Sequence, residues 1–504
     1  MSPLPTSPSP RSGTPQTDLT CGHRSPATEP GPSARRRYTA LGALVAAGAL
    51  LLPGTAALAA GSGSGATAGT TSTTGTTSTA GAARTAGVKY YTPPADPGAI
   101  AQIAALRRAH RNADAAAISA MVKTPQASWL TGGTPAQVRD QARKIVREAA
   151  EEHQVPVLVA YNLPFRDCSQ YSSGGAANTT DYLAWIDGLA AGIGKQQAVL
   201  IVEPDGLGII PFYQPLYGSM DWCQPKDAQG QPMPGANPTE RFKAVNGAVD
   251  KLRALPGAKV YIDGTNSAWL SPGEITDRLM KAGVQRADGF FLNVSNYRTT
   301  EESNHYGGWI SSCLTAVTNG AGWAIDHPGW CPSQYSGSSV DYSPAHVADV
   351  DAQYVGMLGG ATPTTRYIVD TSRNGKGGND MSAYAAAPYN QPADVVAGLK
   401  AANWCNPPGA GLGLRTTSNT GVALAAAYLW IKTPGQSDGS CDSAGSARPW
   451  DYSAYNPWGL TDPVKQSHFD PLWGMVDPAA GAWFPQQALE LAHLAEPPLA
   501  TKDH

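Results

Sequence analysis

Amphipathic helical segments and short, uninterrupted apolar segments alternate along most of this 504-residue chain. Residues 134–154 place apolar side chains at helical spacing behind Thr134, a favourable N-cap, and lead directly into the apolar segment 155–164. Strands that are apolar at every position are typical of parallel sheets covered by helices on both faces. The chain is therefore expected to have an α/β fold.

The same helix–strand unit recurs through the rest of the chain. Further strands are predicted at residues 197–205, 258–265, 289–297, 365–372 and 425–433. Further helices are predicted at residues 97–122, 180–194, 238–255, 271–283, 345–358 and 482–496. So many consecutive units favour one (β/α) barrel over two small domains. A doubly wound open sheet is the structural alternative, although no GxGxxG motif follows the first strand, which argues against dinucleotide binding.

The N-terminal residues differ in composition from the rest of the chain. Residues 35–60 combine a basic start, an apolar stretch and small residues at the end, which is the layout of a secretory signal peptide. Residues 1–60 are therefore expected to be a leader with an export signal, residues 61–87 a Gly/Ser/Thr-rich linker, and residues 88–504 a single globular domain. Sec and twin-arginine export both stay open. An uncleaved membrane anchor is the alternative, which the Pro-Gly break at 53–54 disfavours, so no membrane partner is expected after cleavage.

Charge and cysteine content narrow the expected partners. A formal net charge of −3 with scattered basic residues gives no reason to expect nucleic acid. Of seven cysteines, Cys21 lies in the leader and the other six fit the disulfides of an exported protein. Six cysteines permit fifteen connectivities, and proximity along the chain favours Cys168–Cys223, Cys313–Cys331 and Cys405–Cys441. The sequence has no CxxC or HExxH pattern, and no metal or cofactor is expected.

Acidic residues follow most of the predicted strands, namely Asp167, Asp205, Asp263, Asp370 and Asp438. A single aspartate in such a place most often caps a loop, but the carboxyl ends of parallel strands meet at one edge, where barrel enzymes have their active sites. Clustered carboxylates repel one another, so some stay protonated at neutral pH. A protonated carboxyl beside an ionised one is what cleavage of a glycosidic bond requires.

Aromatic residues accompany these acids on segments expected to be loops, namely Trp129, Tyr161, Trp269, Tyr297 and Trp404. Flat rings bury the apolar C–H face of a sugar while neighbouring acids and amides bind its hydroxyls. The sequence has no competing nucleophile–histidine pair. His305 and His327 lie in stretches expected to be loops and are assigned to the surface.

The segments YNLPFRDCSQYSSGG, IVEPDGLG, YIDGTNSAWL, NVSNY, IVDTSRNG, WCNPPGAGLG and LWIKTPGQSDG together resemble glycoside hydrolase family 6. The resemblance runs from about Trp129 to Leu494. It implies a secreted, inverting cellulase without a cofactor, with its catalytic domain on a distorted (β/α) barrel of fewer than eight parallel strands. The expected function is a β-1,4-glucanase, slightly favoured as an endoglucanase. A cellobiohydrolase and a non-catalytic β-glucan-binding barrel are the alternatives, and a monomer is expected.

The resemblance also implies roles for individual residues. Asp205 matches the general acid, and Asp167 matches the neighbouring acid that raises the pKa of the general acid. Ser173 matches a residue that helps to hold the attacking water. Asp438 matches the catalytic base, and Arg373 matches the arginine that pairs with it.

Sugar contacts and disulfides are implied in the same way. The residues expected to bind substrate are Trp129, Tyr161, Arg166, Asp263, Trp269, Asn296, Arg373, Trp404 and Lys432. The Cys168–Cys223 and Cys405–Cys441 pairs match two disulfides of the family, which would make Cys313–Cys331 an additional one. Asn266 stands where the family has His and Gln436 where it has Glu, so the preference of the sugar subsites is harder to assign than the reaction.

Overall fold

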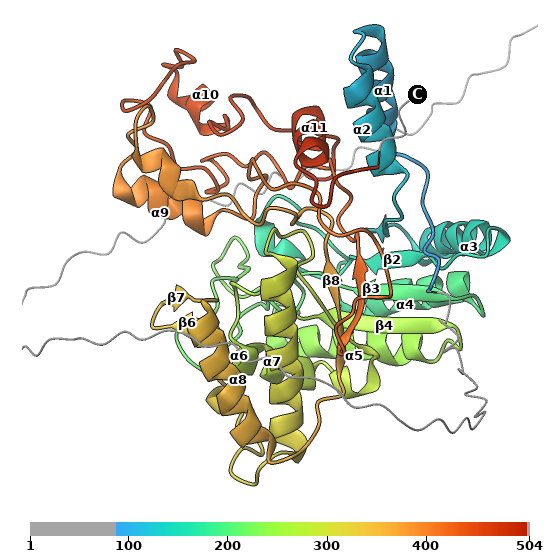
Figure 1. Cartoon of the computed structure of the whole chain (residues 1–504). Helices are drawn as coiled ribbons and strands as arrows, with labels where there is room; N and C mark the ends of the chain where they lie inside the picture. Colours follow the sequence, from blue (N-terminus) through green and yellow to red (C-terminus); the bar gives the residue numbers. More distant parts are fainter. Residues whose placement is uncertain (1–86, 501–504) are drawn as a thin grey trace, which may run out of the picture. The chain divides into compact units, whose positions relative to one another are not determined.

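A computed structural model describes residues 87–500, and the expected leader and nearly all of the linker lie outside these residues. Its main sheet has seven strands, all parallel, in the order β1-β2-β3-β4-β5-β8-β9 (Figure 1). The strands are β1 (Ser128–Leu130), β2 (Val157–Ala160), β3 (Ala198–Val202), β4 (Ala258–Asp263), β5 (Gly289–Leu292), β8 (Arg366–Asp370) and β9 (Ala425–Leu429). The expected barrel with fewer than eight parallel strands is confirmed.

Hydrogen bonds next to the two edge strands bring the sheet round toward a barrel. The Ala127 amide donates to the Trp430 carbonyl oxygen at 2.8 Å. The Trp129 indole Nε1 donates to the Ile431 carbonyl oxygen, also at 2.8 Å. Trp129 was expected in a loop, but it lies in β1, whose three residues are too few to show a strand pattern.

Two apolar layers explain why the strands are apolar at every position. Val159 of β2 and Ile201 of β3 belong to a core inside the barrel. Their neighbours Leu158 and Leu200 belong to a second core between the sheet and the helices. Successive strand side chains point to opposite faces, and both faces are buried here.

Eleven α-helices lie in the described residues (Figure 1). They are α1 (Pro97–Arg108), α2 (Asn112–Val122), α3 (Pro135–Glu151), α4 (Thr179–Ile193), α5 (Pro238–Arg253), α6 (Pro272–Lys281), α7 (Thr300–Asn319), α8 (Pro344–Leu358), α9 (Ala393–Ala401), α10 (Pro463–Ser467) and α11 (Pro485–His493). Thr134 is the N-cap of α3 as predicted, with a complete capping box to Gln137. None of the helices that the structure describes is long and apolar enough to cross a membrane.

Helix α7 was missed in the sequence, where no helix is predicted between residues 283 and 345. The helix begins behind Thr299, which forms a capping box with Glu302. His305 therefore lies in a helix and not in a loop. Gly307 hides the helical pattern, yet it is required because a Cβ there would lie 2.8 Å from the Tyr367 ring of β8. Hydrophobic residues at 310, 314 and 317 carry the signal that the glycine obscured.

The ends of the domain pack together. Figure 1 shows α1 and α2 beside α11, at the same end of the view as α9 and α10. Leu106 of α1, Ile118 of α2 and Leu491 of α11 share one core cluster. The Gln436 amide reaches the same region, where its Nε2 donates to the Asp96 carboxylate, the N-cap of α1, at 2.9 Å.

Three disulfides join Cys168 to Cys223, Cys313 to Cys331 and Cys405 to Cys441. This pairing confirms the one favoured by proximity along the chain. Each bond closes a segment near the carboxyl edge of the sheet or the end of α7, where the chain has little regular structure of its own. Cross-linking such segments limits the conformations of the unfolded chain.

A cavity substitution tests the two-layer core. Leu200→Ala should lower the free energy of unfolding by about 2–5 kcal/mol, because Leu200 is fully buried between β3 and the helices. Val355→Ala on α8 is the matched control, since that side chain is 72% exposed and its loss should change stability by less than about 0.5 kcal/mol. Denaturant titration followed by circular dichroism measures both, and equal effects would contradict this description of the core.

Candidate active site

A cavity of about 420 Å³ opens at the carboxyl edge of the parallel sheet. Ten residues that the sequence singled out line it, namely Tyr161, Asp167, Asp205, Asn266, Trp269, Asn296, Tyr297, Trp404, Lys432 and Asp438. These residues come from segments that follow five different strands and from the segment after α9. The barrel topology therefore brings together acids and aromatic rings that lie far apart in the sequence.

Asp205 lies at the centre of the acidic group. No hydrogen bond joins its carboxyl to any other described residue, while the carboxyls of Asp263, Asp167 and Asp438 are close enough to act on it electrostatically. Burial raises the pKa of Asp205 well above its usual value, and repulsion from these three carboxylates raises it further. Asp205 is therefore a carboxylic acid that keeps its proton and faces an open cavity.

The turn that carries Asp205 is held in an unusual backbone conformation. Glu203 and Asp205 both have positive φ angles, of 58° and 61°. The buried Glu203 carboxyl accepts the backbone N–H groups of Asn162 and Leu163 at 2.9–3.0 Å, which ties this turn to the segment after β2. Left-handed backbone at such residues persists only where its surroundings enforce it. Glu203 escaped the sequence analysis because one buried acid in an apolar strand has no pattern.

Asp167 begins a short 3₁₀ turn after β2. The Tyr161 hydroxyl donates a short hydrogen bond to its carboxylate. Burial raises the pKa of Asp167 to about 6, although that hydrogen bond and the nearby guanidinium of Arg166 oppose the rise. Arg166 itself lies over the Tyr161 ring, 4.4 Å from the centroid, and does not line the cavity.

Asp438 has the opposite electrostatic environment. Arg373 donates to both carboxylate oxygens of Asp438, at 3.0 and 2.9 Å, and the Lys432 ammonium lies 3.4 Å from Oδ1. The Tyr297 hydroxyl donates to Oδ2 at 2.8 Å. Burial favours the neutral acid, but the two cations outweigh it and lower the pKa of Asp438. This carboxylate is therefore ionised beside the neutral Asp205.

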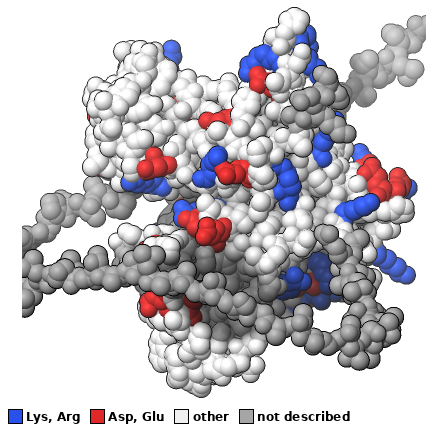
Figure 2. All heavy atoms as spheres, viewed as in Figure 1, with Lys and Arg blue, Asp and Glu red and all other residues white. Residues whose placement is uncertain are grey.

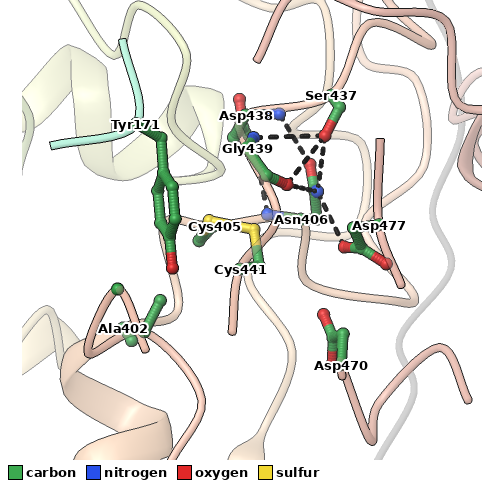
Figure 3. The surroundings of a disulfide bond; sticks show 12 residues. Tyr171, Ala402, Cys405, Asn406, Ser437, Asp438, Gly439, Cys441, Asp470 and Asp477 are labelled. Carbon is green, nitrogen blue, oxygen red and sulfur yellow. Dashed lines mark hydrogen bonds between the residues drawn. A yellow bond between two sulfur atoms is a disulfide. The ribbon is translucent and has the colours of Figure 1, made fainter. Parts of the chain in front are cut away.

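Asn406 anchors the segment that carries Asp438 (Figure 3). Its backbone N–H donates to Asp438 Oδ2 at 3.0 Å, and its side-chain Oδ1 accepts the Asp438 N–H at 2.9 Å. Its Nδ2 donates to Asp477 Oδ2 at 2.9 Å. Asn406 was missed because its role depends on contacts between segments that are distant in the sequence.

One group of potential metal ligands occurs in residues 87–500. Cys441, Asp470 and Asp477 bring their ligand atoms within 4.8 Å of one another. Cys441 is in a disulfide with Cys405, so its sulfur is not a thiolate, and Asp470 is paired with the buried Arg448 at 3.1 Å. The donor set does not suit a metal ion.

Two of the acids at strand ends, Asp263 and Asp370, accept hydrogen bonds from backbone N–H groups of neighbouring segments. The Asp263 carboxylate accepts the N–H groups of Leu207 and Gly208 at 3.0 and 3.2 Å, which fixes the turn after Asp205. The Asp370 carboxylate accepts N–H groups from Ile431 and Lys432 at 3.1 and 2.9 Å. Asp263 was expected to contact sugar, but it does not line the cavity.

The aromatic residues lie on different sides of the cavity. Trp129 stands edge-on to Tyr161 with the ring centroids 5.2 Å apart, behind the lining residues. The Trp269 ring lies so close to Gly208 that a Cβ there would be 2.3 Å from it, which explains the second glycine of PDGLG. Trp404 lies 6.3 Å from the Tyr171 ring and lines the cavity with it.

The segment after β2 contacts the segment after β9 through Tyr171. The Tyr171 hydroxyl accepts the Asp442 backbone N–H at 3.0 Å, and its ring lies against Gly439 and Gly445. Figure 3 shows the ring beside the Cys405–Cys441 disulfide. Two segments that border the cavity are thus joined at one side of it.

The two remaining sequence expectations concern polar residues near the cavity. Ser173 is exposed and does not line the cavity, whereas its neighbour Ser172 does. The Ser172 carbonyl oxygen accepts from Arg166 Nε at 2.8 Å. Asn266 lines the cavity, whereas Gln436 is hydrogen-bonded to Asp96, so only the first of the two departures from the family lies at the cavity.

Comparison with known proteins agrees with this site. The model of the family "Glycosyl hydrolases family 6" matches residues 85–495. Endoglucanase 1 of Streptomyces halstedii is 31% identical over 329 residues, which cover 65% of this chain and 75% of that protein. The 1,4-beta-D-glucan cellobiohydrolase C of Emericella nidulans is 26% identical over 401 residues, which cover 76% and 71%.

Solved structures give the same result. The endoglucanase of Mycobacterium tuberculosis, solved in complex with a thio-linked cellobioside, is 32% identical with a TM-score of 0.51, and the match covers 81% of this chain and 98% of that one. The resemblance seen in the sequence is confirmed. With its acidic cavity at the carboxyl edge of a seven-stranded parallel barrel, this chain belongs to glycosyl hydrolases family 6 and is a glycoside hydrolase.

Proposed function

We propose that this protein hydrolyses the β-1,4 bonds of cellulose with inversion, and that Asp205 is its general acid. The observation that carries the proposal is the contrast between two carboxyls. Asp205 has a raised pKa and no hydrogen-bond partner for its carboxyl within residues 87–500, whereas Asp438 is ionised between Arg373 and Lys432. Protonation of the leaving oxygen requires a neutral carboxyl, and activation of water requires an ionised one. Both are present in one cavity.

The proposed proton transfers follow from this geometry. Asp205 donates its proton to the glycosidic oxygen as the bond from that oxygen to the anomeric carbon breaks. Water attacks the anomeric carbon from the opposite face, and Asp438 is the group proposed to accept the proton of that water. Asp167 keeps the proton on Asp205 before reaction, because an ionised Asp167 disfavours a second negative charge nearby.

Uncharged lining groups suit a neutral polymer. Trp269, Trp404 and Tyr161 offer ring faces to the sugar C–H groups, and Asn296 offers an amide to its hydroxyls. On the face shown in Figure 2, acidic and basic side chains are interspersed among larger uncharged areas. Cellulose is accordingly the proposed partner, and one of the relatives named above is a 1,4-beta-D-glucan cellobiohydrolase.

Endo action is favoured over exo action by the higher identity to endoglucanases. A specific observation supports the second candidate, a cellobiohydrolase, because Tyr171 joins the two segments that border the cavity and restricts access there. A non-catalytic β-glucan-binding barrel is the third reading. This reading gives no reason for a protonated Asp205 at the cavity, because binding alone does not require proton transfer.

The proposal includes the expected organisation of the whole chain. Residues 1–60 are inferred to direct export by the Sec or the twin-arginine route and to be removed, and residues 61–87 to act as a linker. Residues 88–504 then form the catalytic domain, which works outside the cell as a monomer. The three disulfides fit an oxidising compartment.

Removal of the proposed acid gives the first test of this function. Asp205→Ala should lower kcat on carboxymethyl cellulose by at least about 100-fold, since general acid catalysis contributes on the order of 100- to 10,000-fold. Release of reducing sugar measures the rate. Asp187→Ala, on the exposed side of α4, is the control and should keep the wild-type rate. Near wild-type activity of Asp205→Ala would remove the assignment of the acid.

The pH profile tests the link between Asp167 and Asp205. Activity requires neutral Asp205, so it falls as pH rises through the pKa of that group. In Asp167→Asn a neighbouring negative charge is lost, the pKa of Asp205 falls, and the alkaline limb of kcat should move to lower pH. A limb that stays in place or moves upward would show that Asp167 does not hold this proton.

Viscosity separates the two modes of attack. An endoglucanase should reduce the viscosity of carboxymethyl cellulose strongly for each reducing end released, because internal cuts halve chains. The Asp205→Ala protein serves as the blank. A small change in viscosity per bond cut would favour the cellobiohydrolase, and hydrolysis of xylan in preference to β-1,4-glucan would revise the substrate.

A further inference from the structure

Three tryptophans of the described residues have strongly exposed side chains, and all three belong to two loops. Trp222 lies in the segment between β3 and α5, whereas Trp323 and Trp330 lie in the segment between α7 and α8. Each of these side chains is 54% exposed. The other tryptophans in residues 87–500 are buried or half-buried. Exposed rings are costly in water, so their concentration in one region calls for a ligand.

The first loop connects the cavity to the second loop. Trp222 lines the active-site cavity, and its neighbour Cys223 is bonded to Cys168 beside Asp167. The Asp221 amide donates to the Tyr213 carbonyl oxygen at 2.8 Å, which closes the loop. Within the loop closed in this way, Tyr217 is 69% exposed, and its hydroxyl donates to the Gly329 carbonyl oxygen at 3.2 Å, next to Trp330.

The second loop holds its rings in place. The Cys313–Cys331 disulfide fixes its end to α7. Trp323 and Trp330 lie with their ring centroids 6.3 Å apart and their planes 28° from parallel. The His327 ring stacks on Trp330 at 3.9 Å. Rings held in this way lose little freedom when a ligand stacks on them.

Both loops rest on the first turn of α6. The Leu216 N–H donates to Glu274 Oε2 at 2.8 Å, and Gly273 lies against the Pro328 carbonyl oxygen. Helix α6 follows β4, so its N-terminus is at the carboxyl edge of the sheet, where the cavity opens. The aromatic groups of the two loops thus form one surface that begins at the cavity.

We propose that this aromatic surface, defined as Tyr217, Trp222, Trp323 and Trp330, binds a β-glucan chain where it extends out of the catalytic cavity. The proposal rests on the proposed function, which supplies the class of ligand. A β-glucan is the proposed ligand because Trp222 belongs both to the cavity lining and to this surface. A glucan chain that leaves the cavity on this side would contact Trp222 first and then the rings of the second loop. A chain of neutral sugars needs stacking faces and no charge, which these side chains provide.

The surface should matter for long substrates alone. Trp323 and Trp330 do not line the cavity, so a short oligosaccharide bound there gains nothing from them. A polymer gains contacts with both. Loss of both contacts should therefore weaken binding of the polymer roughly tenfold and leave binding of a short oligosaccharide unchanged.

Binding to phosphoric-acid-swollen cellulose tests the proposal in the full chain. All proteins carry Asp205→Ala, so that the polymer is not degraded during the assay. Adding Trp323→Ala and Trp330→Ala should weaken binding roughly tenfold in a depletion assay. Trp323→Tyr with Trp330→Tyr should restore most of it, and Val355→Ala is the matched control for loss of an exposed hydrophobic side chain.

Hydrolysis distinguishes this proposal from the proposed function. With Asp205 intact, the Trp323→Ala/Trp330→Ala variant should hydrolyse a chromogenic cellotrioside at the wild-type kcat/KM, which also shows that it is folded. Cellulose binding equal to wild type would overturn the aromatic surface alone. A wild-type protein that hydrolyses no β-glucan would overturn the proposed function, while the binding assay still decides the surface. Dimers that dissociate in the alanine variant, with cellulose binding unchanged, would assign the surface to a second copy of the chain.

Discussion

Hydrogen-bond donors, more than distances between acids, decide which carboxyl group of this site is charged. Asp438 receives donors from Arg373, Tyr297 and Asn406 and stays ionised although it is buried. Asp205 receives no donor from the described part of the chain and keeps its proton. Because both carboxyls are buried, the repulsion between them is stronger than in water, and one fixed charge at Asp438 helps to hold the proton on Asp205. The division of labour between acid and base follows from this asymmetry.

Other aspartates at the ends of strands hold the backbone in place and take no part in the reaction. Asp263 and Asp370 also end strands, but backbone N–H groups occupy their carboxylates. They hold the turns that present Asp205 and Lys432, and Glu203 does so from the other side of the Asp205 turn. Positive φ angles at Glu203 and Asp205 show that these turns are enforced by their surroundings. Asp205 is thus positioned by acids whose own carboxylates are occupied by hydrogen bonds from the backbone.

Sequence reasoning reached the fold and most of the cavity because both depend on local pattern. Apolar strands, N-caps such as Thr134, and acids at strand ends are visible in the sequence itself. It failed where a tertiary contact overrides local preference. Gly307 interrupts the pattern of α7 only because Tyr367 needs the space, and the three residues of β1 are a strand only through pairing with β2. Asn406 has no sequence signal, since each of its partners lies in a distant segment.

Asn406 shows why a neutral group separates two acidic sites. On one side it bonds the ionised Asp438, and on the other it donates to Asp477, whose pKa is raised to about 9 by burial and by the nearby Asp470 carboxylate. A charged Asp477 would place a second uncompensated anion close to Asp438, because Arg448 is already paired with Asp470. With Asp477 protonated, Asn406 connects the two sites through hydrogen bonds alone. The charge on Asp438 is then set by Arg373 and Lys432, which contact its carboxylate directly, and not by the acids behind it.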